Sequence, residues 1–347
     1  MKIETITPVF IGSGNVLTGL EYFMKDDFVY FISLDELIKT IAKENYKEKC
    51  EYLSNFIKDN LKNNKVENKE KLFTRELVDE LIRKEKYIRK VAVEKSSNFN
   101  KMSSNIQEFI TTNNKPFIPG SSIKGAIITT IIYDAFDTID FNLPISDKKK
   151  FEKDFEIQIN NKIYEKYNKL LRYNDKEDFV NLFFNKISIS DVNLNNFSGE
   201  IKKINTYGMS QKPNDMISLE TYRGEGIIDI KSEIIDLENL KKITNRYFLK
   251  SLYYFEKNIK EEHIKRKIKE LVENIKKNEY MYLIIGGHNG WYFKSLLDLV
   301  KEHPKFEEIR RKLNLGKHPK YNIYSKSFPK TYKLTKENEI LGVVRIK

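Results

Sequence analysis

A hydroxyl-rich turn before an apolar helix is predicted in the segment NKPFIPGSSIKGAIITTIIYDAF, residues 114–136. The segment has a Pro-Gly turn, two serines that offer hydroxyl and N–H groups, and a lysine that adds a positive charge. Helix N-termini attract anions because their first N–H groups lack partners within the helix. We therefore expect a phosphate here, held by Gly120, Ser121, Ser122, Lys124 and Gly125. The alternative is that one of the serines only caps the helix.

The same segment is not an ATP-binding P-loop, because Ala126 stands where that loop requires lysine. A second glycine-rich stretch, IGSGNVLTG at residues 11–19, suggests a dinucleotide-binding fingerprint. Leu17, however, occupies the place of the third glycine, and no helical pattern follows. This stretch is predicted to be a hairpin-like turn.

A third glycine-rich stretch, GGHNGWYFKS at residues 286–295, combines glycines with aromatic residues and Lys294. Glycines let a phosphodiester approach the backbone, and aromatic rings stack on bases for ~1–3 kcal/mol each. Trp291 or Tyr292 is the candidate for stacking. The alternative is a left-handed turn with Trp291 and Phe293 in the core.

Few residues are suited to catalysis. Among the four histidines only His288 lies in a site-like setting, and no H-E-x-x-H motif occurs. The other three are predicted in loops or on a charged helical face: His263, His303 and His318. Asp191 and Glu225 have no obvious second carboxylate for a metal and are expected to form turns or salt bridges. No metal or cofactor is expected.

The charge of the chain is uneven. The net charge is +12, and residues 241–347 carry +14 of net charge against −2 for the rest. A basic C-terminal third indicates a polyanionic partner, with nucleic acid first. The alternative is that lysine-rich helices only present solvated faces.

The single cysteine, Cys50, excludes an internal disulfide and a cysteine-based zinc site. Apolar neighbours at helical spacing predict that it lies in the core. The N-terminus lacks the apolar region of a signal peptide, and no uncharged run reaches membrane-spanning length. We expect a soluble, cytoplasmic protein without a membrane partner.

The elements that must position these residues alternate irregularly between strands and helices. Strands with a hairpin at Asp26-Asp27 come first, followed by helical patterns, strands with turns at their glycines, long helices over 238–277 and a terminal strand. This order favours an α+β fold. The predicted core is a ferredoxin-like (RRM-like) antiparallel sheet with helical insertions at about 34–101 and 147–178. Two units are expected, residues 1–236 and a basic helical and glycine-loop region, residues 237–347, that packs on the first or completes a second RRM-like unit.

The three glycine-rich stretches, in this order, resemble the RAMP proteins of CRISPR effector complexes. The string IPGSSIKG is the most specific of them. The finer similarity is to the fifth subunit of the type III-A Csm complex. It includes the opening TPVFIGSG, the pair Ser190-Asp191, the segment YRGEGI, Tyr292 to Ser295, Pro329 to Thr331 and Leu341-Gly342.

This resemblance implies a subunit without catalytic activity that covers the 3′ part of the CRISPR RNA (crRNA). It implies that the subunit caps the filament of backbone RAMP subunits and supports trimming of the RNA. The implied partners are the crRNA, the backbone RAMP subunit, the small helical subunit and a recruited host nuclease. The residues expected to contact RNA are Gly12, Ser13, Gly14, Gly120, Ser121, Ser122, Lys124, Gly125, Arg223, Gly286, Gly287, Trp291, Lys294 and Lys330.

Two alternatives remain open. One is a metal-independent endoribonuclease of the same superfamily that uses His288 as a general acid or base. The other is an assembly subunit that contacts only neighbouring subunits.

Overall fold

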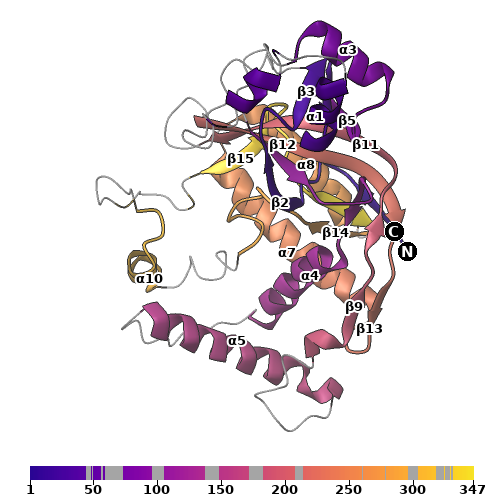
Figure 1. The fold of residues 1–347 in the computed structure, drawn as a ribbon. Helices are drawn as coiled ribbons and strands as arrows, with labels where there is room; N and C mark the ends of the chain where they lie inside the picture. Colours follow the sequence, from indigo (N-terminus) through magenta and orange to yellow (C-terminus); the bar gives the residue numbers. More distant parts are fainter. Residues whose placement is uncertain are drawn as a thin grey trace.

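The computed structural model shows a mixed α+β protein in which helices surround one large sheet (Figure 1). The α+β prediction is thereby confirmed. The structure describes residues 1–43, 48, 50–55, 58, 73–95, 105–136, 148–171, 183–207, 214–259, 261–277, 279–295, 304–317, 324, 329 and 331–347. Parts of the two predicted insertions lie outside these residues.

The main sheet follows one path of neighbouring strands. In order these are β14 (Met281–Ile284), β16 (Val343–Ile346), β1 (Lys2–Thr5), β12 (Asn214–Ile227), β11 (Asn195–Tyr207), β5 (Arg89–Val93), β4 (Phe28–Phe31) and β3 (Tyr22–Lys25). Off this path, β15 (Tyr332–Thr335) pairs with β11, β6 (Ile106–Phe109) with β12, and β2 (Gly12–Leu17) with β6. Between described strands of this sheet, β5–β11 and β6–β12 are parallel and the other pairings are antiparallel.

Two smaller sheets complete the strands that the structure describes. One contains β7 (Thr111–Thr112), β8 (Lys115–Ile118) and β10 (Val192–Asn193), and the other pairs β9 (Ile187–Ile189) with β13 (Ile230–Ser232). These short strands flank the middle glycine-rich stretch, since β8 leads directly into the helix that follows it.

The two ends of the chain meet in the main sheet. The N–H of Lys2 donates to the carbonyl of Lys347 at 3.1 Å, and the N–H of Lys347 donates back at 2.8 Å. Figure 1 accordingly shows the N and C termini side by side. Residues on both sides of the predicted boundary at 236 thus pair in one sheet, and the division into two units stays a prediction.

Helix α4 (Gly120–Ala135) is apolar on several faces and packs against α5 (Lys148–Leu171), α7 (Leu237–Asn258), β9 and β14. Near its end, Asp134 is buried; it accepts a hydrogen bond from Tyr167 on α5 at 2.6 Å and pairs with Arg246 on α7. This carboxylate therefore ties three helices together.

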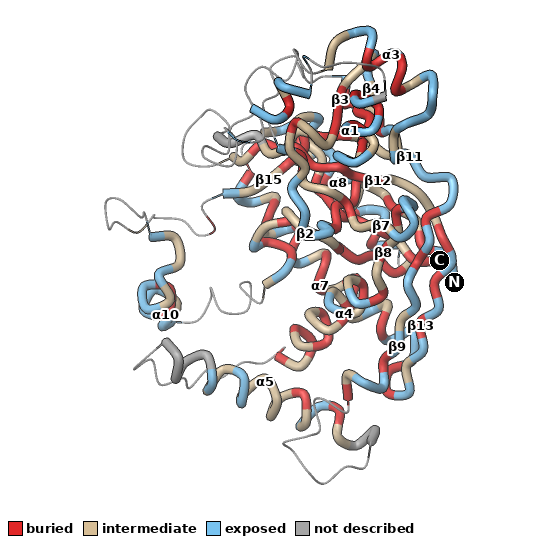
Figure 2. The backbone as a smooth tube through the Cα atoms, in the orientation of Figure 1, coloured by how far each residue is buried: buried red, intermediate tan, exposed pale blue. Residues whose placement is uncertain are grey.

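Among the described residues, the core consists of three apolar clusters (Figure 2). The largest joins the main sheet to α4, and the second joins α7, α8 (Glu262–Lys276), β14 and β15. The third lies where α1 (Leu34–Lys43) and α3 (Arg75–Arg83) cover the β3–β4 hairpin. A short helix, α10 (Phe306–Lys312), also occurs in the described part of the C-terminal region. No helix among the described residues is long and apolar enough to cross a lipid bilayer.

Several predictions at the level of elements are confirmed. The β3–β4 hairpin turns at Asp26, whose φ is +48°. The residues expected to be helical after 34, after 122 and over 238–277 form α1, α4 and the pair α7–α8.

Other predictions were wrong. Gly224 and Gly226 do not form turns but lie within β12, where a Cβ atom on Gly226 would come within 2.4 Å of Val192 on β10. Gly12 begins strand β2 rather than forming a tight turn. Cys50 is exposed. Strands β5 and β6 were not expected from the sequence.

Candidate functional site

Residues from the middle and late glycine-rich stretches line one cavity of about 240 Å³. The first half of α4 contributes Ser121, Ser122 and Gly125, and the late stretch contributes Phe293 and Lys294. Later residues of α4 and side chains of α7 and β14 form the rest of the wall, including the hydroxyl-bearing Thr244, Tyr247 and Tyr282. Residues as far apart in the sequence as Ser121 and Lys294 thus share one wall.

The N-terminus of α4 already holds an anion of the protein itself. The N–H of Gly120 donates to the Asp191 carboxylate at 2.7 Å. A Cβ atom on Gly120 would lie 2.2 Å from the carbonyl oxygen of Ile189, so this glycine is required by the close approach of β9. Asp191 thus accepts a backbone hydrogen bond rather than forming the expected turn or salt bridge with a described residue, and the first N–H group of the helix is not open to a phosphate.

The next turn of α4 is open. Neither serine caps the helix, because Pro119 is the N-cap residue and the Asp191 carboxylate accepts the hydrogen bond from the N–H of Gly120. Ser121 and Gly125 are exposed, and no atom lies within 4 Å of the position of a Cβ on Gly125. The hydroxyls of Ser121 and Ser122 and the ammonium of Lys124 form no hydrogen bond or ion pair with a residue that the structure describes.

The late stretch contacts the segment just before the first glycine-rich stretch. The N–H of Gly287 donates to the carbonyl of Phe10 at 2.7 Å. Gly286 has a φ of +78°, and a Cβ there would lie 2.1 Å from the same oxygen. Both the backbone conformation and the contact explain this glycine, so the glycine pair joins two parts of the protein.

The serine of the first stretch bonds within the protein. Ser13 donates its hydroxyl proton to the Glu108 carboxylate at 2.9 Å, and Glu108 also pairs with Arg89 at 3.0 Å. Gly14, in contrast, has a φ of +94° and nothing near its Cβ position. Contact between RNA and Gly12, Ser13 or Gly14 stays a prediction.

The aromatic residues of the late stretch divide between surface and core. Trp291 is 49% exposed, whereas Tyr292 and Phe293 are buried among the aromatic side chains of the second cluster. Of the two candidates for stacking on a base, Trp291 and Tyr292, Trp291 is the one with an exposed ring.

His288 is held by polar neighbours on both sides of its ring. Its Nε2 lies 2.9 Å from Gln107 Oε1 on β6, and its Nδ1 lies 3.0 Å from Lys333 Nζ on β15. Burial, together with the positive charges of Lys333 and Lys294, lowers the pKa of His288 to about 4. The imidazole is therefore neutral near pH 7, with both nitrogen atoms engaged.

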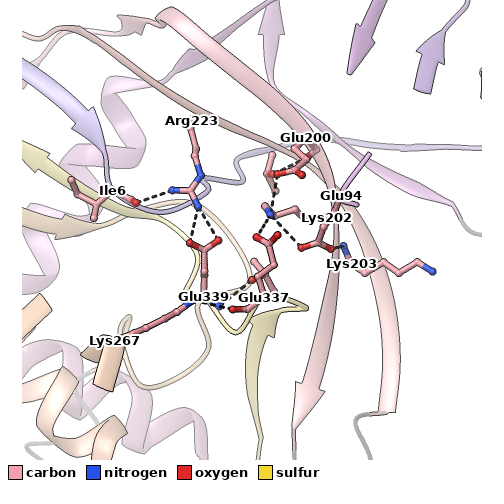
Figure 3. Close-up of polar contacts among 11 residues, drawn as sticks. Ile6, Glu94, Glu200, Lys202, Lys203, Arg223, Lys267, Glu337 and Glu339 are labelled. Atoms are coloured by element: carbon pink, nitrogen blue, oxygen red, sulfur yellow. Dashed lines mark hydrogen bonds and ion pairs between the residues drawn. The ribbon is translucent and has the colours of Figure 1, made fainter. Parts of the chain in front are cut away.

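Arg223 bonds within the protein rather than pointing outward (Figure 3). It makes two hydrogen bonds of 2.8 Å to Glu339 and a third, also of 2.8 Å, to the carbonyl of Ile6. Nearby, the ammonium of Lys202 is surrounded by Glu94, Glu200 and Glu337. Glu225 pairs with Lys2 at 2.6 Å, as expected of it.

Some predicted residues lie outside the described part of the chain, namely Lys330, His303 and His318. His263 is exposed on α8. No group of three or more histidine, cysteine, aspartate or glutamate side chains suited to a metal ion occurs among the described residues.

Sequence reasoning missed Lys333. It lies two residues after the PKT segment, on a strand whose sequence alone shows no site signal. Its role emerges only because β15 pairs with β11 and thereby faces His288. The hydroxyls from α7 were missed for the same reason.

Comparisons with known proteins agree with this arrangement. A family model described as the RAMP superfamily matches residues 2–314. The "CRISPR system Cms protein Csm5" of Methanocaldococcus jannaschii is 29% identical over 340 residues, which cover 89% of this chain and 76% of that protein.

Two solved structures have a similar fold. One is a chain of a "Csm-crRNA-target RNA ternary complex in type III-A CRISPR-Cas system", with a TM-score of 0.69, 17% identity and coverage of 100% of this chain and 99% of the other. The second is T. onnurineus Csm5, with a TM-score of 0.60, 13% identity and coverage of 99% and 100%. These similarities confirm the resemblance that the motifs indicate, and the family match over most of the length shows that this chain belongs to the RAMP superfamily.

Proposed function

We propose that this chain is the fifth subunit of a type III-A CRISPR effector complex and binds crRNA without cleaving it. The similarity to Csm5 of M. jannaschii and the shared fold with a chain of a Csm–crRNA–target RNA complex support this. In this proposal the chain covers the 3′ part of the crRNA, caps the filament of backbone RAMP subunits and supports trimming of the RNA.

One observation supports RNA binding more than any other. The cavity between α4 and the late stretch brings together Lys294 and two serine hydroxyls that have no hydrogen-bond partner among the described residues. Lys124 lies on the adjacent helical turn, and exposed Trp291 lies three residues before Lys294. Hydroxyls and ammonium groups bind phosphates, and an exposed indole stacks on a base.

The proposed RNA contacts are therefore a subset of those predicted from the sequence. They are the contacts of Ser121, Ser122, Lys124, Gly125, Trp291 and Lys294. Gly120 and Gly286 have structural reasons to be glycine, the N–H of Gly287 is bonded to Phe10, and Arg223 is paired with Glu339. Such contacts recognise the backbone and stack on bases, so little discrimination between RNA sequences is expected.

The proposal includes no catalytic step. A general acid or base needs a proton that it can give or take near neutral pH. His288 has a pKa of about 4 because of burial and two nearby lysines, and both of its nitrogens contact the protein. This geometry supports a structural rather than a catalytic histidine. We further infer that the sheet core derives from a ferredoxin-like (RRM-like) arrangement.

The proposed partners are the crRNA, the backbone RAMP subunit, the small helical subunit and a host nuclease recruited for trimming. The test is to co-purify the complex from its host, crosslink the RNA and sequence the RNA ends. Crosslinks between the α4 turn and nucleotides of the 3′ part are expected. If crosslinks place residues 121–125 away from any nucleotide, the proposed site is wrong.

A matched pair of measurements tests the absence of cleavage. The purified chain is incubated with repeat RNA in EDTA, beside the His288→Ala variant. No specific product is expected from either. Specific cleavage by the unmodified chain that His288→Ala abolishes would instead establish the endoribonuclease alternative.

A further inference from the structure

The cavity between α4 and the late stretch leads from an exposed mouth to a buried interior. Of the residues that line it, Ser121, Gly125 and Lys294 are exposed. Phe293 and Phe248 also line it but are buried; Phe248 lies on α7, which packs against α4 (Figure 1). The phosphate contacts proposed above use groups at the mouth, so they leave the interior without a role.

The interior is apolar and uncharged. Its walls include the buried side chains of Phe248, Leu283, Ile284 and Phe293, and the two phenylalanine rings meet edge to face with 6.1 Å between their centroids. Among the described residues that line the cavity, the one charged residue is Lys294, at the mouth. A phosphate inside would lose its hydration without gaining a charged partner, so the interior suits a flat, largely apolar group.

Hydroxyl groups of buried threonines add acceptors to these apolar walls. Thr130 donates its hydroxyl proton to the carbonyl of Ile127 at 2.7 Å, and Thr244 donates its own to the carbonyl of Leu240. Both protons are thus used within the helix that carries them, and the hydroxyl oxygens keep acceptor capacity. A ring with N–H or amino groups matches such acceptors, whereas a hydrocarbon leaves them unused.

The size of the cavity limits the ligand to one or two rings. An apolar cavity of about 150 Å³ holds benzene, and pockets for drug-sized ligands begin at about 300 Å³. The volume of this cavity, about 240 Å³, lies between the two. A nucleobase meets these conditions, because it is flat, has one or two rings and carries ring N–H or amino groups.

We propose that the cavity binds one nucleobase splayed out of a bound RNA strand, while Lys294 and the Ser121 hydroxyl hold its phosphate at the mouth. The inference rests on the proposed function, because it adds a base pocket to that RNA surface. Recognition of single-stranded RNA relies on bases that are splayed out of the strand. The exposed ring of Trp291, three residues before Lys294, offers a platform for a neighbouring base and thereby favours a strand over a free nucleotide.

The experiment blocks the cavity without removing a charge. Gly125→Leu adds a side chain at the mouth, and no atom lies within 4 Å of the Cβ position there, so the helix can accommodate it. The affinity of the full chain for a fluorescent single-stranded RNA is measured over a range of salt concentrations. Gly125→Leu should weaken binding by roughly 5- to 100-fold, as for the loss of one base–aromatic stack, and leave the salt slope unchanged. Lys294→Met should instead reduce the slope by ~0.7.

The matched control is Asn258→Leu, which adds the same side chain at the exposed end of α7. This position lies about 15 Å along the helix from Phe248, which lines the cavity. It should leave both the affinity and the slope unchanged. Thermal unfolding verifies that each variant is folded.

A strand without bases distinguishes a base pocket from hindrance of the phosphates. The same measurements are made with a strand of stable abasic residues, on which Gly125→Leu should have no effect. An equal loss of affinity on both strands, or no loss on RNA, would overturn the base pocket while the proposed function stands.

A second readout decides the case in which the chain binds no RNA, which would contradict the proposed function. Adenosine monophosphate is titrated by NMR into the unmodified chain and into Gly125→Leu. Binding that the substitution abolishes would overturn the splayed base and assign the cavity to a free nucleotide. Binding that the substitution leaves unchanged, or no binding, would overturn the base pocket altogether.

Discussion

Some charged side chains in this protein are buried together with side chains of opposite charge. Burial disfavours the charged form of Lys202, but the hydrogen bonds that its ammonium donates to Glu337 and Glu200, together with the nearby charge of Glu94, outweigh this and raise the pKa of the lysine. Burial likewise raises the pKa of Glu94. The cluster is thus a buried ionic network that depends on all of its members.

We expect Lys202→Met to destabilise the fold by about 3–5 kcal/mol, because it leaves the fully buried Glu94 without its partner. Urea unfolding measures the change. The exposed Lys231→Met should change stability by less than about 0.5 kcal/mol. A loss below about 1 kcal/mol for Lys202→Met would show that solvent reaches Glu94 in solution.

His288 makes folding stability depend on pH. Its pKa is lowered to about 4 by burial, by Lys333 and by Lys294, so the unfolded chain binds a proton at a higher pH than the folded chain. The stabilisation is fully present above pH 6.5 and is lost as the pH falls toward 4. It amounts to at most about 3 kcal/mol at neutral pH.

The measurement compares the free energy of unfolding at pH 7.5 and pH 4.5 for the unmodified chain and for His288→Gln. The unmodified chain should lose more stability on acidification. Equal losses in the two proteins would contradict the lowered pKa.

At the level of elements, glycines of the same helix serve different purposes. A side chain at Gly120 would collide with the carbonyl of Ile189 on β9, whereas Gly125 faces open space. The first glycine lets a strand approach the helix, and the second leaves room at the surface next to Lys124.

We therefore expect opposite effects from two identical substitutions on α4. Gly120→Ala should destabilise the protein by about 1–3 kcal/mol or more, because the helix and β9 must separate. Gly125→Ala should stabilise it by up to about 1 kcal/mol, because alanine is the better helix former. Chemical denaturation of both variants tests the pair, and equal effects would show that β9 does not contact α4 as described.

The outer edge of strand β14 is covered by a side chain of helix α7. Asn245 on α7 accepts a hydrogen bond from the N–H of Tyr282 and donates one to the carbonyl of Tyr280, both at 2.9 Å. The side chain thus takes the place of a further strand beside β14. This leaves fewer open backbone groups for pairing with another chain.

At the level of the whole molecule, the terminal strands close the sheet. β16 lies between β1 and β14, and the salt bridges of Glu4 with Arg345 and Lys347 reinforce the junction. Residues at opposite ends of the sequence therefore belong to one cooperative structure.

Deletion of residues 343–347 should prevent folding and not merely remove surface residues, because β14 would lose the strand with which it pairs. Circular dichroism and solubility of the truncated chain measure this. A substitution of Lys347 alone, which removes an ion pair with Glu4 and a contact with the Tyr280 ring, should leave the fold intact. A truncated chain with native-like cooperative unfolding would contradict this account.

The fold class, most helices, the β3–β4 hairpin and the family could be predicted from the amino-acid sequence, because they depend on local periodicity and on motifs of contiguous residues. It also singled out the stretches that contribute Ser121, Ser122 and Lys294. It did not reveal that these residues share a cavity, that Asp191 occupies the start of α4, or that Lys333 joins His288.

Only the tertiary structure decided those points. Each of them pairs residues more than 40 positions apart, and no local pattern specifies which distant strand lies beside which. The same reason explains why Gly224 and Gly226 were taken for turns: their role depends on β10 and β11, whose approach is a property of the folded sheet.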